Sequence, residues 1–223
     1  MKIQLPPNVN KIIGILEKNG YEAFAVGGCV RDSILQREPN DASPQQVKEL
    51  FSHTIDTGIE HGTVTVMLDR CGYEVTTYRI DGKYEDGRHP SSVSFTRNLE
   101  EDLLRRDFTI NAMAYNDSRG LVDLFGGLAD IEAGVIRCVG NPYARFEEDA
   151  LRLLRAIRFA AQLSYRVEDE TMEAMKALAP NLRKISAERI MTELIKTLVS
   201  PNPDMLREAY RCGLTKEFMP EFD

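Results

Sequence analysis

The string GGCVRD at residues 27–32 combines two adjacent glycines with an arginine and an aspartate. Residues 23–26 before it predict a short buried strand, and residues 30–35 predict a helix. Backbone N–H groups at a strand-to-helix turn attract an anion, and glycine admits a phosphate closely because it has no Cβ. Arg31 adds a guanidinium suited to phosphate oxygens. The string predicts a phosphate-binding turn. The alternative is a tight turn with a surface ion pair between Arg31 and Asp32.

Two carboxylates form the second group. Asp41 follows the first motif by the short polar stretch REPN, and Glu74 lies in the strand-like string YEVTTYR. Two-metal phosphoryl transfer needs two or three convergent carboxylates that hold Mg²⁺ ions about 4 Å apart. Each acid taken singly is also an ordinary solvated surface residue, and the sequence alone does not bring the two together.

The string LLRRDFTINAMAY at residues 103–115 predicts a helix. At helical spacing, Arg106, Asp107 and Asn111 could share one polar side while apolar residues face a core. An Arg–Asp–Asn set suits a triphosphate and a ribose hydroxyl. The alternative is a helix N-terminus with ordinary ion pairing.

The string EEDALRLLRAIRF at residues 147–159 lies within a predicted helix over residues 144–162. Four of its charged residues follow one another at a spacing of three: Asp149, Arg152, Arg155 and Arg158. Neighbours at this spacing touch on a helix. An Arg can donate to acceptors on a base edge, while an Asp can accept from an exocyclic amine. Cytosine and adenine carry an amine beside a ring acceptor, whereas guanine and uracil place a carbonyl there. The alternative is a basic helix with an internal salt bridge.

Composition limits the class of protein. The chain has 223 residues, of which 43% are hydrophobic and 28% charged, and this is ordinary for a globular protein. A net charge of −7 argues against a free-standing basic nucleic-acid-binding domain. The four cysteines lie far apart without a C-x-x-C pair, which fits a reducing cytoplasm and predicts no zinc site. No apolar run approaches the roughly 20 residues of a membrane span, and the N-terminus lacks a signal peptide.

The pattern of predicted secondary structure changes near residue 140. The first part alternates short β-rich runs with Gly and Asp turns, and the second part is nearly all helix-like. In the first part the expected helices cover residues 8–18 and 44–51, and the expected strands cover residues 62–68, 73–79 and 135–139. The strands at 62–68 and 73–79 predict a hairpin. In the second part, helices are expected at residues 168–178, 187–199 and 204–210. The sequence predicts a mixed α/β head over residues 1–140 and a helical neck over residues 141–223.

These strings, in this order, resemble the bacterial and eukaryotic class of tRNA nucleotidyltransferases, the CCA-adding enzymes. The resemblance extends to LVDLFGGLADIEAGVIRCVG and to ISAERIMTELIKTL at residues 185–198, and it covers nearly the whole chain. It implies an α+β protein: a polymerase-β-like nucleotidyltransferase head with a mixed sheet, followed by an all-helical neck. It also implies template-independent addition of C, C and A to the tRNA 3′ end from CTP and ATP, with Mg²⁺, in the cytoplasm and away from membranes.

The resemblance assigns roles to residues of this sequence. The implied nucleotide-binding positions are Gly27, Gly28, Arg31, Arg106, Asp107 and Asn111 and, on the nucleotide-recognition helix, Asp149, Arg152, Arg155 and Arg158. Asp41 and Glu74 match metal-binding and catalytic carboxylates. The polar, turn-rich residues 79–95 resemble the flexible loop linked to the switch from C to A addition.

Two departures from the family pattern carry expectations of their own. The family reads Asp-x-Asp, but here Asp41 runs straight into ASPQQV, so the second metal aspartate and its flanking strand residues are absent. A true deletion at this point predicts a loss of catalysis by orders of magnitude. Family members also continue into a helical body and tail, which we expect to be absent beyond Asp223.

Two other functions stay open. A bacterial poly(A) polymerase shares the head motifs, although the complete loop at residues 79–95 and the acidic composition favour a CCA-adding enzyme. A catalytically dead nucleotide- or RNA-binding variant of the same fold is the second alternative, and the missing aspartate favours it. The sequence does not determine the oligomeric state.

Overall fold

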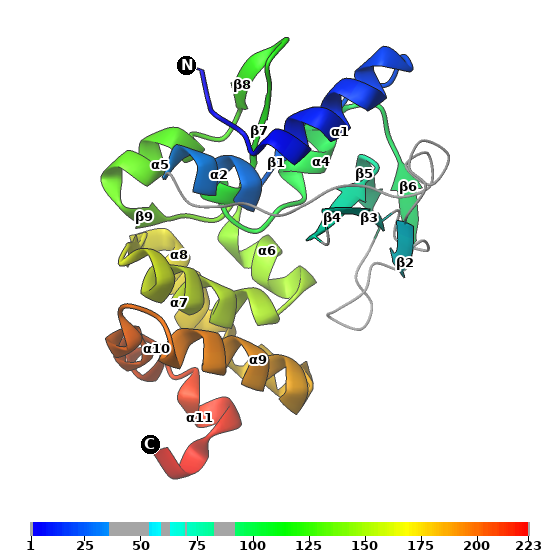
Figure 1. Cartoon of the computed structure of the whole chain (residues 1–223). Helices are drawn as coiled ribbons and strands as arrows, with labels where there is room; N and C mark the ends of the chain where they lie inside the picture. The colour runs from blue at the N-terminus through cyan, green and yellow to red at the C-terminus, as the bar shows by residue number, and fades with distance from the viewer. Residues whose placement is uncertain (1, 36–53, 59–62, 70, 83–91, 223) are drawn as a thin grey trace. The chain divides into compact units, whose positions relative to one another are not determined.

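The computed structural model describes residues 2–35, 54–58, 63–69, 71–82 and 92–222 (Figure 1). The chain divides into two compact units. The first unit comprises Met1–Ile80, Val93–Arg106 and Ile110–Gly127, and the second comprises Asp81–Ser92, Asp107–Thr109 and Leu128–Asp223. Asp41, the predicted helix at residues 44–51 and most of the predicted flexible loop lie outside the residues that the structure describes.

One sheet of the first unit carries the glycine turn. Strand β1 (Ala25–Val26) pairs antiparallel with β7 (Met113–Asn116), which pairs antiparallel with β8 (Gly120–Asp123). Helix α2 (Gly28–Ile34) starts directly after β1, as the sequence predicts. The chain therefore passes from strand to helix at Gly27, and the neighbouring strand β7 comes from the third motif.

A second sheet holds the strand with Glu74. It comprises β2 (Thr54–Gly58), β3 (Thr63–Leu68) and β4 (Cys71–Thr76), paired antiparallel in that order. The β3–β4 pair is the predicted hairpin, and its Thr65 lies opposite Glu74. Short strands β5 (Arg79–Asp81) and β6 (Val93–Phe95) pair separately.

Two further helices of the first unit pack beside these sheets. Helix α1 (Pro7–Lys18) buries the apolar residues Val9, Ile12, Ile13 and Leu16. Their spacing of three and four places them on one face of the helix, which explains why this segment is helical. Helix α4 (Leu99–Leu104) is capped by Asn98, whose side chain accepts a hydrogen bond from the N–H of Glu100. Leu99 and Leu103 of this helix pack against Ala114 of β7.

The predicted helix over residues 103–115 is wrong. Helix α4 ends at Leu104, a 3₁₀ turn η2 spans Thr109–Asn111, and β7 follows. Every residue of β7 is buried, and so is Ile110 before it. A segment buried on all sides suits a central strand between β1 and β8 better than an amphipathic helix, and periodicity alone could not separate the two.

The second unit is mostly helical. It contains one short parallel pair of strands, β9 (Val135–Ile136) and β10 (Arg166–Val167), so the strand predicted at residues 135–139 is shorter than expected. Its helical segments are α5 (Gly127–Ala133), α6 (Pro142–Glu148), α7 (Leu151–Leu163), α8 (Asp169–Leu178), η3 (Ala179–Lys184), α9 (Ala187–Leu198), η4 (Pro203–Met205), α10 (Leu206–Arg211), α11 (Thr215–Phe218) and η5 (Pro220–Phe222). The helices expected at residues 168–178 and 187–199 are therefore confirmed.

The single helix expected over residues 144–162 is wrong, because the structure divides it into α6 and α7. Asp149 lies between them in an extended conformation (φ −146°, ψ 104°). Its carboxylate accepts a hydrogen bond from the N–H of Leu151 at 3.0 Å, which satisfies one of the donors at the start of α7. Asp149 thus precedes the helix with the three arginines and supplies an acceptor to its first N–H.

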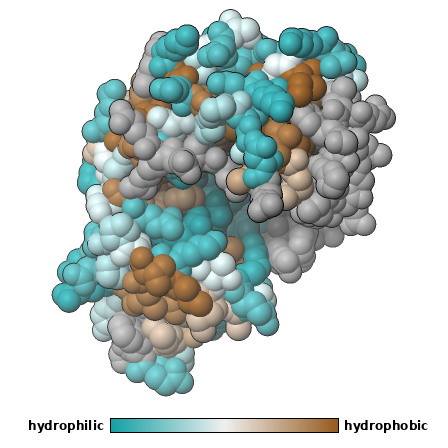
Figure 2. Space-filling view, viewed as in Figure 1, coloured by the Kyte–Doolittle hydropathy of each residue, from teal (hydrophilic) through white to brown (hydrophobic). Residues whose placement is uncertain are grey.

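The surface of the second unit includes an apolar area, which Figure 2 shows in brown among hydrophilic side chains. Four exposed apolar residues on α9 and at its C-cap share one side of the helix by their spacing: Met191, Ile195, Leu198 and Val199. Among the residues that the structure describes, no helix is long and apolar enough to cross a membrane.

Candidate nucleotide-binding site

The glycine turn needs glycine at its first position. Gly27 has a φ of +68°, and its N–H donates to the carbonyl oxygen of Met113 at 2.9 Å. A Cβ at this position would lie 2.8 Å from Nη1 of Arg106 and 3.3 Å from the carbonyl oxygen of Asn111. The guanidinium of Arg106 is therefore pressed against the turn. Gly28 is the first residue of α2.

Arg31 joins the first and third motifs. Its Nη1 donates to Oδ1 of Asn111 at 2.5 Å, and both side chains are buried. The same guanidinium donates to both carboxylate oxygens of Asp32, at 2.8 and 2.9 Å. The ion pair between Arg31 and Asp32, which is the alternative interpretation of GGCVRD, is thus present. It coexists with the contact between Arg31 and Asn111, which are 80 residues apart. The pairing of β1 with β7 brings these motifs together.

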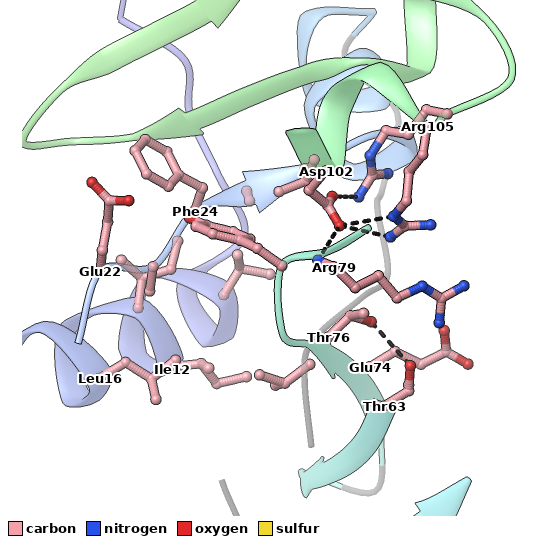
Figure 3. Close-up of a pocket in the computed structure, with 18 residues that line it drawn as sticks. Ile12, Leu16, Glu22, Phe24, Thr63, Glu74, Thr76, Arg79, Asp102 and Arg105 are labelled. Carbon is pink, nitrogen blue, oxygen red and sulfur yellow. Dashed lines mark hydrogen bonds and ion pairs between the residues drawn. The ribbon is translucent and has the colours of Figure 1, made fainter. Parts of the chain in front are cut away.

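Asp102 is a charged residue that the sequence analysis missed. Its side chain is only 3% exposed, and it forms ion pairs with Arg105 at 2.7 Å and Arg106 at 2.9 Å. It also accepts a hydrogen bond from the N–H of Arg79 at 3.2 Å (Figure 3). Burial raises the pKa of the Asp102 carboxyl, but the charges and hydrogen bonds of Arg106 and Arg105 outweigh burial and hold this pKa below its ordinary value. Its spacing of three and four from the two arginines was the signal that could have identified it.

These residues border a cavity of about 320 Å³ in the first unit. Figure 3 shows Ile12 and Leu16 of α1 on one side of it, and Asp102, Arg105 and Arg79 on another. The cavity is thus lined by apolar side chains together with three guanidinium groups (Arg79, Arg105 and Arg106) and three carboxylates (Glu22, Glu74 and Asp102). The arginines are the groups there that can bind an anionic ligand, and the apolar side offers contact to an apolar part of it.

Of the two predicted metal ligands, the structure describes Glu74 and does not describe Asp41. Glu74 is exposed on β4 and borders the same cavity, while Asp41 lies outside the described residues. Within the described ranges, no group of three or more His, Cys, Asp or Glu residues could hold a metal ion. The exposed carboxylate of Glu74 has the oxygen chemistry that Mg²⁺ prefers, and the paired site stays a prediction.

The second unit places Asp149 and Arg152 differently from the predicted helix. Asp149 pairs with Arg189 of α9 at 2.8 Å, and Arg152 pairs with Glu148 at 2.6 Å. The side chains of Asp149 and Arg152 therefore pair with different residues. Nη1 of Arg152 also donates to the carbonyl oxygen of Arg145 at 3.1 Å. Both side chains are held in defined positions.

Asp107, Arg155 and Arg158 also have partners within the second unit. Arg155 donates to Oδ2 of Asp107 through Nε at 2.8 Å and Nη2 at 2.5 Å. Burial lowers the pKa of Arg155, but the Asp107 carboxylate outweighs burial and raises it above the ordinary value. Arg158 pairs with Glu193 at 2.9 Å. Asp107 therefore does not share a helix side with Arg106 and Asn111, which belong to the first unit.

Comparison with known proteins identifies related sequences. Residues 23–137 match the family described as "Poly A polymerase head domain", and residues 164–223 match "Probable RNA and SrmB- binding site of polymerase A". A CCA-adding enzyme of Streptococcus gordonii is 47% identical over 226 aligned residues, which cover 97% of this chain and 57% of that protein. The alignment is longer than this chain, so the relative has residues at positions where this chain has none.

Solved structures agree with the sequence match. The structure of a Bacillus stearothermophilus CCA-adding enzyme in complex with CTP has a TM-score of 0.85 and 40% identity, over 94% of this chain and 53% of that one. A Thermotoga maritima CCA-adding enzyme complexed with tRNA has a TM-score of 0.78 and 25% identity, over 99% and 57%.

These matches establish the family of the chain and the part of its relatives that it covers. The chain spans about half the length of the curated relatives that it matches. The likeness of both sequence and fold confirms the predicted polymerase-β-like head and the predicted resemblance to CCA-adding enzymes. The chain belongs to the family that carries the poly A polymerase head domain.

Proposed function

We propose that this chain binds CTP and ATP and contributes the catalytic head and the neck for addition of C, C and A to the 3′ end of tRNA. The observation that carries the proposal is the turn at Gly27, with Arg106 pressed against it and Arg31 bonded to Asn111. The relative solved with CTP supports the choice of nucleotide, and the relative solved with tRNA supports the choice of acceptor. We place the head at residues 1–140, the neck at residues 141–223, and the reaction in the cytoplasm.

In the proposed reaction, the 3′-hydroxyl oxygen of tRNA attacks the α-phosphorus of the bound nucleotide. The new oxygen–phosphorus bond forms as the bond between the α-phosphorus and the bridging oxygen breaks, and pyrophosphate leaves with that oxygen. The glycine turn and Arg106 hold the triphosphate through backbone N–H groups and a guanidinium. Asn111 orients Arg31 and, together with Asp107, belongs to the proposed nucleotide-binding set.

Base selection is proposed to reside in the second unit. Asp149 accepts from the exocyclic amine of cytosine or adenine, while Arg152 donates to the adjacent ring acceptor. Arg155 and Arg158 complete the recognition helix. The ion pairs to Arg189 and Glu148 support this proposal, because they fix both base-reading side chains before a nucleotide arrives.

Mg²⁺ is the proposed cofactor, and Glu74 with Asp41 would hold it. When bound, it would supply charge neutralisation at the transferring phosphate and lower the pKa of the attacking hydroxyl. The residues described here contribute binding and orientation, whatever the number of ions.

One assay separates the CCA-adding activity from its nearest rival. The chain is incubated with tRNA that lacks its CCA end, together with CTP, ATP and Mg²⁺, and the product is sequenced. The proposal predicts a defined CCA end. A tract of A residues would instead identify a poly(A) polymerase, whose name the matched head family also carries.

The missing second aspartate favours one further candidate function, a nucleotide- or RNA-binding protein without catalysis. The extra residues of the Streptococcus relative agree with a deletion in this chain. Calorimetric titration with CTP and Mg²⁺, run beside the activity assay, tests this candidate. Binding without product would support it, and a CCA end would contradict it.

A further inference from the structure

We propose that Asp102 is a positioning residue for nucleotide binding, which fixes the guanidinium of Arg106 against the glycine turn and joins it to the start of β5. This inference rests on the proposed function, because it concerns the same nucleotide site. Asp102 does not need to touch the nucleotide to act in this way.

The contacts of Asp102 are arranged around both of its oxygens. Oδ1 accepts from Nε and Nη2 of Arg105, at 3.0 and 2.7 Å, and from the N–H of Arg79 at 3.2 Å. Oδ2 accepts from Nη2 of Arg106 at 2.9 Å. One nearly buried carboxylate thus holds two adjacent arginines and the backbone at the first residue of β5.

Arg106 keeps donor capacity for a ligand in this arrangement. Its Nη1 faces the turn at the distance that excludes a Cβ on Gly27, and its side chain is 24% exposed. Its buried Nε has no hydrogen-bond partner among the residues that the structure describes. Arg105, by contrast, uses both Nε and Nη2 on Asp102. Arg106 is therefore the member of the pair that is prepared to bind phosphate.

The physical benefit of Asp102 is pre-organisation. A free arginine side chain samples many rotamers and loses that freedom when it binds an anion. Asp102 already restricts Arg106 in the unliganded protein, so less freedom is lost on binding. The lowered pKa of the Asp102 carboxyl keeps it ionised at neutral pH, and the restraint then persists.

A double-mutant cycle on CTP affinity tests the inference. The dissociation constant for CTP is measured by calorimetry for the wild-type chain, Asp102→Asn, Arg106→Ala and the double variant. We expect each single change to weaken binding about tenfold, the loss expected for a charge-assisted hydrogen bond. Because Asp102 acts through Arg106, the double variant is expected to bind no more weakly than Arg106→Ala.

Control variants exclude a general effect on α4. Glu100→Gln removes an exposed acid from the same helix and is expected to leave CTP affinity unchanged. Asp102→Glu keeps the charge and is expected to restore affinity to within about threefold of the wild type. If Asp102→Asn melts below the assay temperature, the same cycle is run at a lower temperature at which all four chains are folded, again with coupling expected.

The possible results separate a failure of the positioning role from a failure of the proposed function. Losses that multiply in the double variant, or an Asp102→Asn chain that binds CTP as tightly as the wild type, would overturn the positioning role alone. A wild-type chain that binds no CTP would overturn the proposed function, and this inference with it.

Discussion

Individual residues in this protein are constrained by close approach as much as by chemical type. Gly27 is required because Arg106 occupies the space that a Cβ would fill, and because its φ is positive. The guanidinium of Arg31 has a fixed orientation because it donates hydrogen bonds to the side chains of Asn111 and Asp32. The role of each of these motif residues therefore depends on specific contacts in the folded chain.

Gly27→Ala is expected to destabilise the chain by about 2 kcal/mol and to weaken CTP binding. At φ +68° and ψ −127° the backbone lies in a region that L-residues rarely adopt, at a cost of about 1–3 kcal/mol, and the clash with Arg106 displaces the proposed phosphate-binding group. Urea unfolding and CTP calorimetry measure both effects. Gly14→Ala is the control, since no atom lies within 4 Å of its Cβ position in α1 and alanine favours a helix interior by about 0.5–1 kcal/mol. Equal stability changes for the two variants would contradict the prediction.

Asp149→Ala combined with Arg152→Ala is expected to reduce discrimination for C and A more than it reduces triphosphate affinity. The reason is that these side chains are proposed to read the base edge, whereas the glycine turn holds the phosphates. Binding of all four nucleoside triphosphates is measured. Arg166→Ala, an exposed arginine of the same unit, serves as the control. An equal loss for all four nucleotides would count against the prediction.

At the scale of elements, helix ends position the functional side chains. Asp149 lies between α6 and α7, where one carboxylate oxygen accepts from the N–H of Leu151 and the other accepts from Arg189. Helix α4 has only six residues, so it cannot form by itself and depends on its cap and its packing. The length and capping of short helices thus decide where Asp102 and Asp149 lie.

Asn98→Ala is expected to lower the free energy of unfolding by about 1 kcal/mol, because the N–H of Glu100 loses its acceptor at the start of α4. Asn98→Asp, which keeps a capping oxygen, is expected to retain stability. Thermal or urea unfolding provides the measurement. An alanine variant as stable as the wild type would show that the cap does not hold α4.

At the scale of the whole molecule, the net charge does not describe the local distribution of charged groups. A net charge of −7 suits a protein without nucleic-acid contacts, yet three guanidinium groups lie at the cavity of the first unit, and arginines pair with acids in both units. Local pairing, rather than the net charge, determines which surfaces accept an anion.

Acidification is expected to remove the stability that Asp102 contributes. Its folded-state pKa lies below the ordinary value of 3.8, so the unfolded chain binds more protons between the two values and stability falls as the pH falls. The difference in unfolding free energy between the wild type and Asp102→Asn should therefore be smaller at pH 3 than at pH 7. Urea unfolding at both pH values tests this, and a difference that grows at pH 3 would refute it.

The sequence by itself determined the family resemblance, the α+β class, the β3–β4 hairpin and most of the helices beyond residue 164. These features are encoded in local patterns: glycine at a turn, alternating strand residues and apolar helix faces. It did not determine that residues 103–115 form a turn and a buried strand, nor that Asp149 leaves the helix of the arginines. Those outcomes depend on pairing with β1 and β8 and on a partner in α9, all distant in sequence. They follow from the folded arrangement, in which burial and long-range ion pairs outweigh local helix preference.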